Sequence, residues 1–140
     1  MMVLDTNVIF ELMKRKPDAT VMAWIGEQPM AGLFTTTLTQ AEIFSGLALL
    51  PDGRRSDELM GAAKSMFDVD LAGRVLPFDV DAALAYPDIA VSRRRAGHPI
   101  SQIDAQIAAI VRSRGARLAT RNVRDFLECG IAVVNPWGTT

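Results

Sequence analysis

Short apolar runs alternate with longer stretches of helical periodicity along this chain of 140 residues, and that alternation restricts the folds it can adopt. The runs have the length of strands and little polar alternation, which is typical of strands buried on both faces. They lie at Met2–Leu4, Leu33–Phe34, Val75–Phe78, Leu118–Ala119 and Ile131–Val134. Strands of this kind separated by helices predict an α/β fold in which helices cover both faces of a parallel sheet.

Helices are predicted between most of these runs, at about residues 7–14, 18–28, 40–50, 55–69, 81–96, 102–114 and 123–128. Thr39 with Glu42 is predicted to form a capping box, and Ser101 with Asp104 has the related Ser-x-x-acid spacing. Pro87 falls inside one helical stretch, where it is expected to kink the helix or to begin a separate one.

The composition predicts one folded domain over residues 1–140. Hydrophobic residues make up 49% of the chain, which excludes intrinsic disorder. One cysteine, Cys129, and one histidine, His98, exclude an intramolecular disulfide and a zinc site. No apolar run approaches the ~18 residues of a membrane span, and Asp5 comes too early for a signal peptide. We therefore expect a soluble cytoplasmic protein, with Cys129 a buried small hydrophobe and His98 a solvated loop residue.

The charge is unevenly distributed, although the net charge is only −1. Residues 1–90 carry 7 basic and 13 acidic side chains, whereas residues 91–140 carry 8 and 3, and all 8 of those basic residues are arginines. Arginine suits phosphate recognition because its guanidinium is a planar fork of donors. The pattern indicates either a polyanionic partner on one side of the molecule or a solvated helix face.

Acidic and amide side chains recur at the ends of the predicted strands and at the starts of helices. Asp5 follows the first strand, Glu42 and Asp104 are placed in first helical turns, and Asn122 and Asp125 follow the fourth strand. Because the carboxyl ends of parallel strands share one edge, these side chains can converge there. Clustered carboxylates repel one another unless a cation neutralises them, and hard oxygen ligands select Mg²⁺ or Mn²⁺. A metal site for phosphoryl chemistry is therefore expected.

Each acid also has a simpler structural explanation. Glu42 and Asp104 occupy positions at which an acid stabilises a helix, and Asp5 can cap the first helix. The two interpretations differ physically, because a capping hydrogen bond lowers a carboxylate pKa whereas a metal-free cluster raises it.

Five local strings together resemble the PIN-domain ribonucleases, especially the VapC toxins of toxin–antitoxin pairs and their FitB-like branch. They occur in family order over nearly the whole chain: Val3-Leu4-Asp5-Thr6-Asn7, Thr36-Thr37-x-Thr39-x-Ala41-Glu42, Asp104-Ala105-x-Ile107-Ala108-Ala109, Ala119-Thr120-Arg121-Asn122-x-x-Asp125-Phe126 and Asn135-Pro136-Trp137. The resemblance implies a PIN-like three-layer α/β/α sandwich with a mostly parallel five-stranded sheet.

The same resemblance implies an Mg²⁺- or Mn²⁺-dependent endoribonuclease. A metal-activated water would attack an RNA phosphodiester and leave a 5′-phosphate and a 3′-hydroxyl. The resemblance assigns Asp5, Glu42 and Asp104 as the metal-binding acids, with Thr6 and Thr120 as supporting hydroxyls. Asn7 matches a polar position near the pocket.

The sequence departs from many relatives at the fourth acid, where it has Asn122 instead of aspartate. A neutral amide offers one carbonyl ligand and no charge, so a second metal is not expected to bind firmly. Asp125, three residues later, is expected to restore part of the negative potential. We therefore expect one firmly bound divalent ion.

Arginines near the expected pocket are candidates for RNA binding. Arg121 and Arg124 lie beside it in sequence, and Arg93–Arg95 offers a more distant track for the RNA backbone. Arg121 forming a salt bridge with a pocket acid is the alternative. Trp137 is expected to anchor the last strand to the core.

The resemblance also implies protein partners. A VapB- or FitA-like antitoxin is expected to lie in a hydrophobic groove, with candidate residues at Val21–Ile25 and Phe44–Leu50 and with Trp24 as an anchor. Ordinary core packing explains the same apolar residues. A homodimer is implied as well, and contact with DNA is expected only through the antitoxin.

Two other functions remain as alternatives. The first is a PIN scaffold that binds RNA or a partner with little catalysis, which is motivated by Asn122. The second is a receiver-like Mg²⁺-binding module phosphorylated on Asp79. That alternative fits less well, because the first strand ends in the single acid Asp5 and the last strand is followed by Asn135-Pro136 instead of a lysine.

Overall fold

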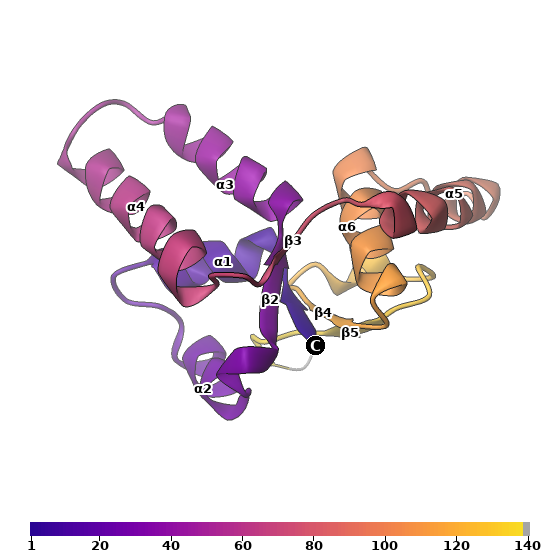
Figure 1. The fold of residues 1–140 in the computed structure, drawn as a ribbon, viewed down its shortest axis with the longest axis horizontal. Coiled ribbons are helices and arrows are strands. Elements are labelled where there is room, and N and C mark those ends of the chain that lie inside the picture. Colours follow the sequence, from indigo (N-terminus) through magenta and orange to yellow (C-terminus); the bar gives the residue numbers. More distant parts are fainter. Residues whose placement is uncertain (139–140) are drawn as a thin grey trace.

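A five-stranded parallel sheet forms the centre of the molecule in a computed structural model that describes residues 1–138 (Figure 1). The strands are β1 (Met2–Leu4), β2 (Leu33–Thr36), β3 (Val75–Leu76), β4 (Arg117–Ala119) and β5 (Ala132–Val134). Their order is β3-β2-β1-β4-β5, and every neighbouring pair is parallel. The predicted strands and their parallel pairing are thus confirmed. The chain leaves β1 toward β2 on one side and β4 lies on the other, so a topological switch point, where parallel sheets bind ligands, lies between β1 and β4.

Helices cover both faces of this sheet (Figure 1). On one face lie α1 (Thr6–Met13), α2 (Ala19–Glu27), α3 (Thr37–Ala48) and α4 (Arg54–Ser65), and on the other α5 (Val80–Arg95) and α6 (Gln102–Ser113). Short helical segments occur at η1 (Met30–Gly32), η2 (Met66–Asp70) and η3 (Val123–Phe126). This is the three-layer α/β/α sandwich that the sequence predicts. Within residues 1–138, no helix is both long and apolar enough to cross a membrane.

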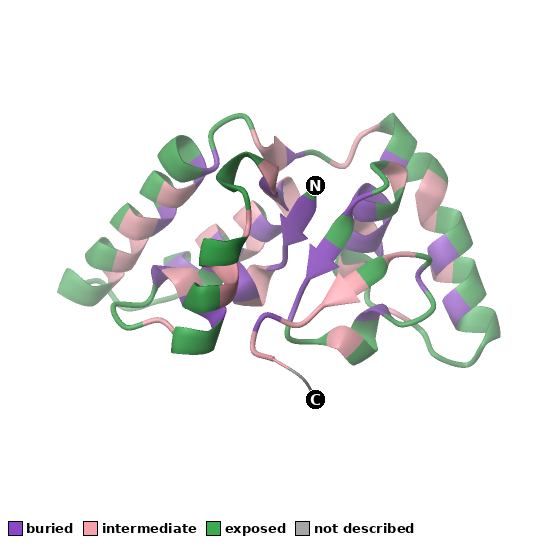
Figure 2. Ribbon diagram, turned by 90° about the horizontal axis from the view of Figure 1, so that it is seen from below, coloured by how far each residue is buried: buried purple, intermediate pink, exposed green. Residues whose placement is uncertain are grey.

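The core consists of two apolar clusters, one on each side of the sheet. Val3 belongs to the cluster beneath α5 and α6, whereas its neighbours Met2 and Leu4 belong to the cluster beneath α1, α3 and α4. This division follows from the alternation of side chains along a strand. Figure 2 shows the buried central strands, the less buried edge strand β5 and the exposed outer faces of the helices. Apolar packing on both faces of the sheet therefore fixes the position of the carboxyl end of β1.

The structure differs from the predicted helices at the start of α3 and at residues 123–128, where only the short 3-10 helix η3 (Val123–Phe126) forms. The N-cap of α3 is Thr36, whose hydroxyl accepts from the Thr39 backbone N–H at 3.1 Å, so the capping box expected from Thr39 and Glu42 is wrong. The last residue of β2 already has the extended backbone and hydroxyl of a cap, which lets the strand pass into the helix without a loop. Glu42 consequently lies in the second turn. Pro87 lies inside α5 and does not begin a separate helix.

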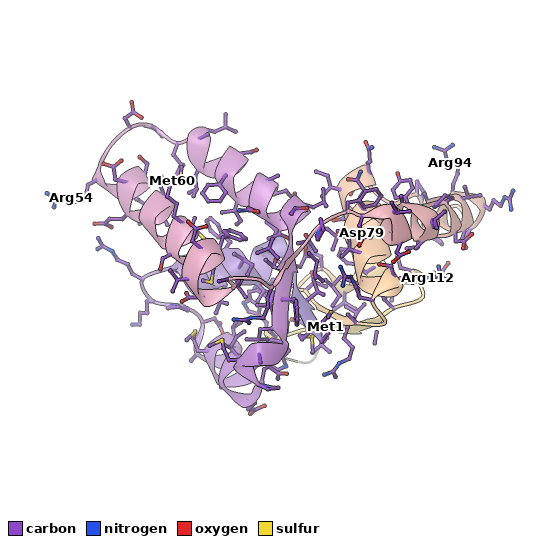
Figure 3. All side chains as sticks on the ribbon, viewed as in Figure 1. Met1, Arg54, Met60, Asp79, Arg94 and Arg112 are labelled. Atoms are coloured by element: carbon purple, nitrogen blue, oxygen red, sulfur yellow. The ribbon has the colours of Figure 1, made fainter. Side chains whose placement is uncertain are left out.

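Arg93 is buried inside the protein, so the expectation that it forms part of an RNA-binding track is wrong. It is only 7% exposed, and its guanidinium donates to the carbonyls of His98 at 2.7 Å, Asp125 at 2.9 Å and Leu127 at 2.8 Å. Arg94 and its neighbour Arg95 are exposed, on the α5–α6 side of the molecule (Figure 3). Arg93 thus ties the loop before α6 to the turn after β4.

We expect Arg93→Ala to lower the free energy of unfolding by about 3 kcal/mol or more, because hydrogen bonds to charged groups contribute ~1.5–3 kcal/mol each and the carbonyls would lose their donor. Urea denaturation of the purified chain measures this change. Arg94→Ala is the matched control and is expected to change stability by less than ~0.5 kcal/mol. Equal effects of the two substitutions would contradict the structural role.

Candidate active site

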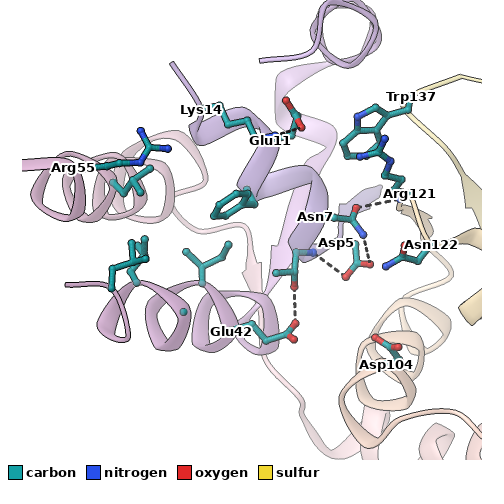
Figure 4. Close-up of a pocket in the computed structure, with 17 residues that line it drawn as sticks. Asp5, Asn7, Glu11, Lys14, Glu42, Arg55, Asp104, Arg121, Asn122 and Trp137 are labelled. Atoms are coloured by element: carbon teal, nitrogen blue, oxygen red, sulfur yellow. Dashed lines mark hydrogen bonds and ion pairs between the residues drawn. The ribbon is translucent and has the colours of Figure 1, made fainter. Parts of the chain in front are cut away.

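A pocket of about 710 Å³ opens at the carboxyl edge of the sheet (Figure 4). Its walls come from α1, α3, α4, the start of α6, the residues after β4 and the segment after β5. Four of the residues predicted for the site from their positions after strands and at helix starts line it together: Asp5, Glu42, Asp104 and Asn122. Residues more than 100 positions apart in the sequence thus face one space, as parallel-strand topology allows.

Asp5 lies at the junction of β1 and α1, where it is 5% exposed. One carboxylate oxygen accepts from the backbone N–H of Thr6 at 2.8 Å and the other from the hydroxyl of Thr120 at 2.7 Å. Burial raises the pKa of Asp5 to about 6 despite these hydrogen bonds, and repulsion by Asp104 and Glu42 adds to the rise. Asp5 therefore caps α1, yet its pKa changes in the direction expected of a metal-free acidic cluster.

Glu42 is held from across the pocket by α1. Its Oε1 accepts from the hydroxyl of Thr6 at 2.6 Å, and that hydroxyl also lies 3.1 Å from the hydroxyl of Thr39. Since Glu42 is in the second turn of α3, its carboxylate does not cap that helix. The simple capping interpretation is therefore wrong for Glu42, and the position of Thr6 agrees with its expected supporting role.

Asp104 lies in the first turn of α6, and its backbone N–H donates to the Ser101 hydroxyl at 3.2 Å. Burial raises the pKa of its carboxyl, against the effect of a hydrogen bond with Ser101, and the negative charges of Asp125 and Glu42 raise it further. The three ion pairs among residues 1–138 do not include Asp104. The helix start thus positions a carboxylate that forms no ion pair among residues 1–138, although the charge of Arg93 lowers its pKa in part.

Thr120 lies behind the pocket wall and connects the site to α1. It is fully buried, donates to Asp5, and accepts from the side chain of Asn7 at 3.2 Å and from the backbone N–H of Asn122 at 3.1 Å. Asn7 in turn accepts from the backbone N–H of Arg121 at 3.1 Å. This network links the carboxyl ends of β1 and β4, the two strands at the switch point.

Some expected site residues do not line the pocket. Arg124 and Asp125 are exposed outside it, and Asp125 affects the site only through its charge on Asp104. Arg121 does line the pocket, but it lies over the ring of Trp137 and forms none of the ion pairs found in residues 1–138. The alternative of a salt bridge between Arg121 and a pocket acid is thus not what the structure contains.

Asp79, the residue of the receiver-like alternative, has an ordinary structural role. Its carboxylate accepts from the backbone N–H of Ala82 at 3.0 Å and caps α5. It also lies 3.4 Å from the guanidinium of Arg114. Asp79 does not line the acidic pocket.

Sequence reasoning missed a polar face of α1 that extends the pocket. Glu11 is buried, and its carboxylate accepts from Lys14 at 3.0 Å and from the backbone N–H of Asp18 at 3.0 Å. These hydrogen bonds lower the pKa of Glu11. Glu11 and Lys14 follow Asn7, which was already expected near the pocket, at a spacing that places all three on one helix face, and this spacing is the signal that could have revealed Glu11 and Lys14.

The far part of the pocket is mostly apolar, with Arg55 of α4 beside it (Figure 4). Its apolar walls come from α1, from α3 and the turn after it, and from α4: Phe10, Ile43, Leu47, Leu50 and Leu59. Leu47 and Leu50 belong to the expected Phe44–Leu50 groove segment. No residue of the other expected segment, Val21–Ile25, lines this pocket, and Trp24 packs against the core instead.

The donor chemistry of the pocket fits a hard divalent cation. The side chains of Asp5, Glu42, Asp104 and Asn122 supply oxygen donors, and histidine and cysteine are absent from the lining. Among residues 1–138, no three His, Cys, Asp or Glu side chains are gathered closely enough to hold one ion directly. The acids instead surround a space, which suits Mg²⁺ because that ion keeps several waters and binds through one or two carboxylates.

This chain is similar to known proteins over nearly its whole length. A sequence model of the family described as "PIN domain" matches residues 2–130. The "VapC ribonuclease Y4jK" of Sinorhizobium fredii is 41% identical, with 98% of each chain covered. The "Toxin FitB" of Neisseria gonorrhoeae is 34% identical, with 98% of this chain and 99% of the relative covered. The structure of FitAB bound to the IR36 DNA fragment contains a chain that is 33% identical and superposes with a TM-score of 0.92, covering 100% of this chain and 98% of that one.

Proposed function

Because this chain belongs to the PIN-domain family and to its VapC-type toxins, we propose that it is an Mg²⁺- or Mn²⁺-dependent endoribonuclease that hydrolyses RNA phosphodiesters to 5′-phosphate and 3′-hydroxyl ends. We propose further that residues 1–140 form one PIN domain. The observation that carries the proposal is the meeting of Asp5, Glu42 and Asp104 in one pocket at the switch point of the sheet.

The three carboxylates would hold a hydrated metal ion, one or two of them by direct contact and the rest through its bound waters, with the side chain of Asn122 as a neutral oxygen donor beside them. When bound, the ion would supply Lewis acidity, lower the pKa of an attacking water and stabilise charge on the leaving oxygen. Burial, with a smaller contribution from neighbouring acids, raises the pKa of Asp5 and of Asp104 in the free protein, so a divalent cation has a favourable electrostatic site there.

The hydrogen-bond network keeps these donors in place. Thr120 and the backbone of Thr6 fix the two oxygens of Asp5, so that carboxylate has little rotational freedom. The hydroxyl of Thr6 fixes Glu42 in the same way from the opposite wall. Arg121, at the rim, would bind a phosphate oxygen of the RNA. Positioning and charge are the main contributions that a protein makes to metal-assisted phosphoryl chemistry.

We also propose that a VapB- or FitA-like antitoxin neutralises the enzyme and that the chain forms a homodimer. The similarity to FitB and to the chain in the DNA-bound FitAB structure supports the antitoxin partner. The apolar part of the pocket, formed by α1, α3 and α4, adjoins the acids and would receive an apolar segment of such a partner.

The test is RNA cleavage by the purified, antitoxin-free chain. We expect cleavage with Mg²⁺ or Mn²⁺, loss of it with a chelator, and products that carry 5′-phosphates. Asp5→Asn and Asp104→Asn should each reduce the rate by at least about 100-fold, in the range seen when a group that stabilises transition-state charge is removed. Asp88→Asn, an exposed acid outside the pocket, is the matched control and should cleave normally. Specific RNA binding without any cleavage would favour the scaffold alternative.

A further inference from the structure

Trp137 lies at the rim of the acidic pocket and is half-buried there. It therefore lines the pocket in addition to anchoring β5. Its ring packs against the core cluster beneath α1 and α3, and the guanidinium carbon of Arg121 lies 4.9 Å from the ring centroid. The backbone N–H of Trp137 donates to the side chain of Asn135 at 3.0 Å, which fixes the turn after β5. The rim therefore carries an ordered pair of flat groups.

Hydrogen bonds connect this pair to the acids. The backbone N–H of Arg121 donates to Asn7, the side chain of Asn7 donates to Thr120, and the hydroxyl of Thr120 donates to Asp5. Figure 4 shows Arg121 and Trp137 beside Asn7 and Asp5, on the side of the pocket opposite to Glu42. A chain bound with one phosphate at the acids would bring its neighbouring nucleotide to this rim.

The position of Arg121 differs from the ion pair that an arginine in an acidic pocket is expected to form. Arg121 lines a pocket with several carboxylates, yet its guanidinium lies over the ring of Trp137 and takes part in none of the ion pairs found in residues 1–138. A stacked guanidinium keeps its donors available at its edge, so it can bind a phosphate while its plane takes part in stacking.

We propose that Arg121 and Trp137 form a stacking site for an unpaired nucleobase next to the phosphodiester that is cut. This inference rests on the proposed ribonuclease function and names a subsite of the same pocket. Single-stranded RNA is commonly bound by stacking of bases on aromatic rings and guanidinium planes. Arg121 attracts the negatively charged phosphate of a nucleotide, whereas it repels a cationic side chain of a protein partner. The chemistry therefore favours a nucleotide at this rim.

The first test compares two RNA substrates of one sequence, of which one lacks the base on the nucleotide next to the cut. Trp137→Leu should raise KM for the intact RNA by about tenfold, within the range that base–aromatic stacking supplies, and leave KM for the abasic RNA and kcat nearly unchanged. Trp137→Phe should restore most of the affinity, because it keeps an aromatic face. Trp24→Leu is the matched control, since Trp24 does not line the pocket.

The second test does not depend on catalysis. The chain has two tryptophans, so Trp24→Phe leaves Trp137 as the only one. Oligouridylate added to this variant with Mg²⁺, and read by rapid mixing before turnover, should quench the fluorescence of Trp137. An abasic ribose-phosphate chain of equal length should not.

The outcomes separate the two proposals. If the wild-type chain cuts RNA but Trp137→Leu affects intact and abasic substrates equally, the stacking site is wrong and the ribonuclease function stands. If oligouridylate quenches Trp137 although nothing is cut, the stacking site stands and the nuclease proposal fails. If a cationic peptide quenches the fluorescence of Trp137 and oligouridylate does not, the proposed nucleobase site is wrong and the rim binds a protein partner instead.

Discussion

Asp5→Asn is expected to abolish RNA cleavage and, in metal-free solution at pH 7, to make the protein more stable. The carboxyl of Asp5 is buried among other acids, and its pKa is raised to about 6. Because an acid with a raised pKa holds its proton more tightly in the folded state, the free energy of unfolding falls as the pH rises from about 4 to 6 and stays low above that range. Each unit of pKa corresponds to about 1.4 kcal/mol.

The neutral side chain of asparagine removes this cost. Its one carbonyl oxygen can accept from either Thr6 or Thr120, so part of the gain is offset by a weakened hydrogen bond. A net gain of about 1–2 kcal/mol remains, and for a chain of this size it should raise Tm by roughly 2–8 °C. Thermal unfolding with a chelator present, at pH 7 and at pH 4, measures it.

The controls isolate the carboxyl group. The difference between wild type and Asp5→Asn should nearly vanish at pH 4, where Asp5 is protonated in the folded protein. Asp18→Asn replaces an exposed cap of α2 with an equally good capping residue and should change little at either pH. The contrary result is an Asp5→Asn variant that is less stable than wild type by the same amount at pH 7 and at pH 4. That result would show that Asp5 contributes to stability mainly through its capping hydrogen bonds.

Magnesium is expected to stabilise the wild-type protein strongly and in a pH-dependent way. A ligand that binds only the folded state at 100 times its Kd adds about 2.7 kcal/mol, or roughly 5–10 °C in Tm for a chain of this size. Protons compete with the metal for Asp5 and Asp104, whose pKa values are both raised. The Tm increase at a fixed Mg²⁺ concentration should therefore be larger at pH 7.5 than at pH 5.

Substitutions separate this binding from general salt effects. Asp104→Asn should remove most of the Mg²⁺-dependent increase, whereas Asp88→Asn should retain it. Sodium chloride at the same ionic strength supplies the comparison for screening. An increase that is equal in both variants, or that does not change with pH, would contradict a cation held by the pocket acids.

The parts of the fold set by local patterns were predictable from the sequence. Five apolar runs without polar alternation predicted the parallel sheet, and Asp5 directly after the first of them marked the edge at which the candidate site lies. The Ser101 cap was also predictable, because one spacing defines it. The cap of α3 was not, since Thr36 and Thr39 are chemically equivalent and only the end of β2 decides between them.

Side-chain contacts between segments that are far apart in the chain could not be predicted from the sequence. Arg93 is indistinguishable in sequence from Arg94, yet it is buried because three carbonyls from two loops converge on it. Glu42 looked like a capping acid because its partner, Thr6, comes from a different helix. Trp137 was assigned to the core because its contact with Arg121 becomes visible only when β4 and β5 are paired.

The proposed mechanism depends on one hydrated divalent cation in the pocket surrounded by Asp5, Glu42 and Asp104. Crystals of the chain grown with Mn²⁺ test it most directly, through anomalous diffraction at the manganese absorption edge. We expect one strong anomalous peak in the pocket, in contact with Asp5 and Asp104, which disappears in crystals of Asp104→Asn. Protein that cleaves RNA in the same solution but shows its manganese peak elsewhere would contradict the account.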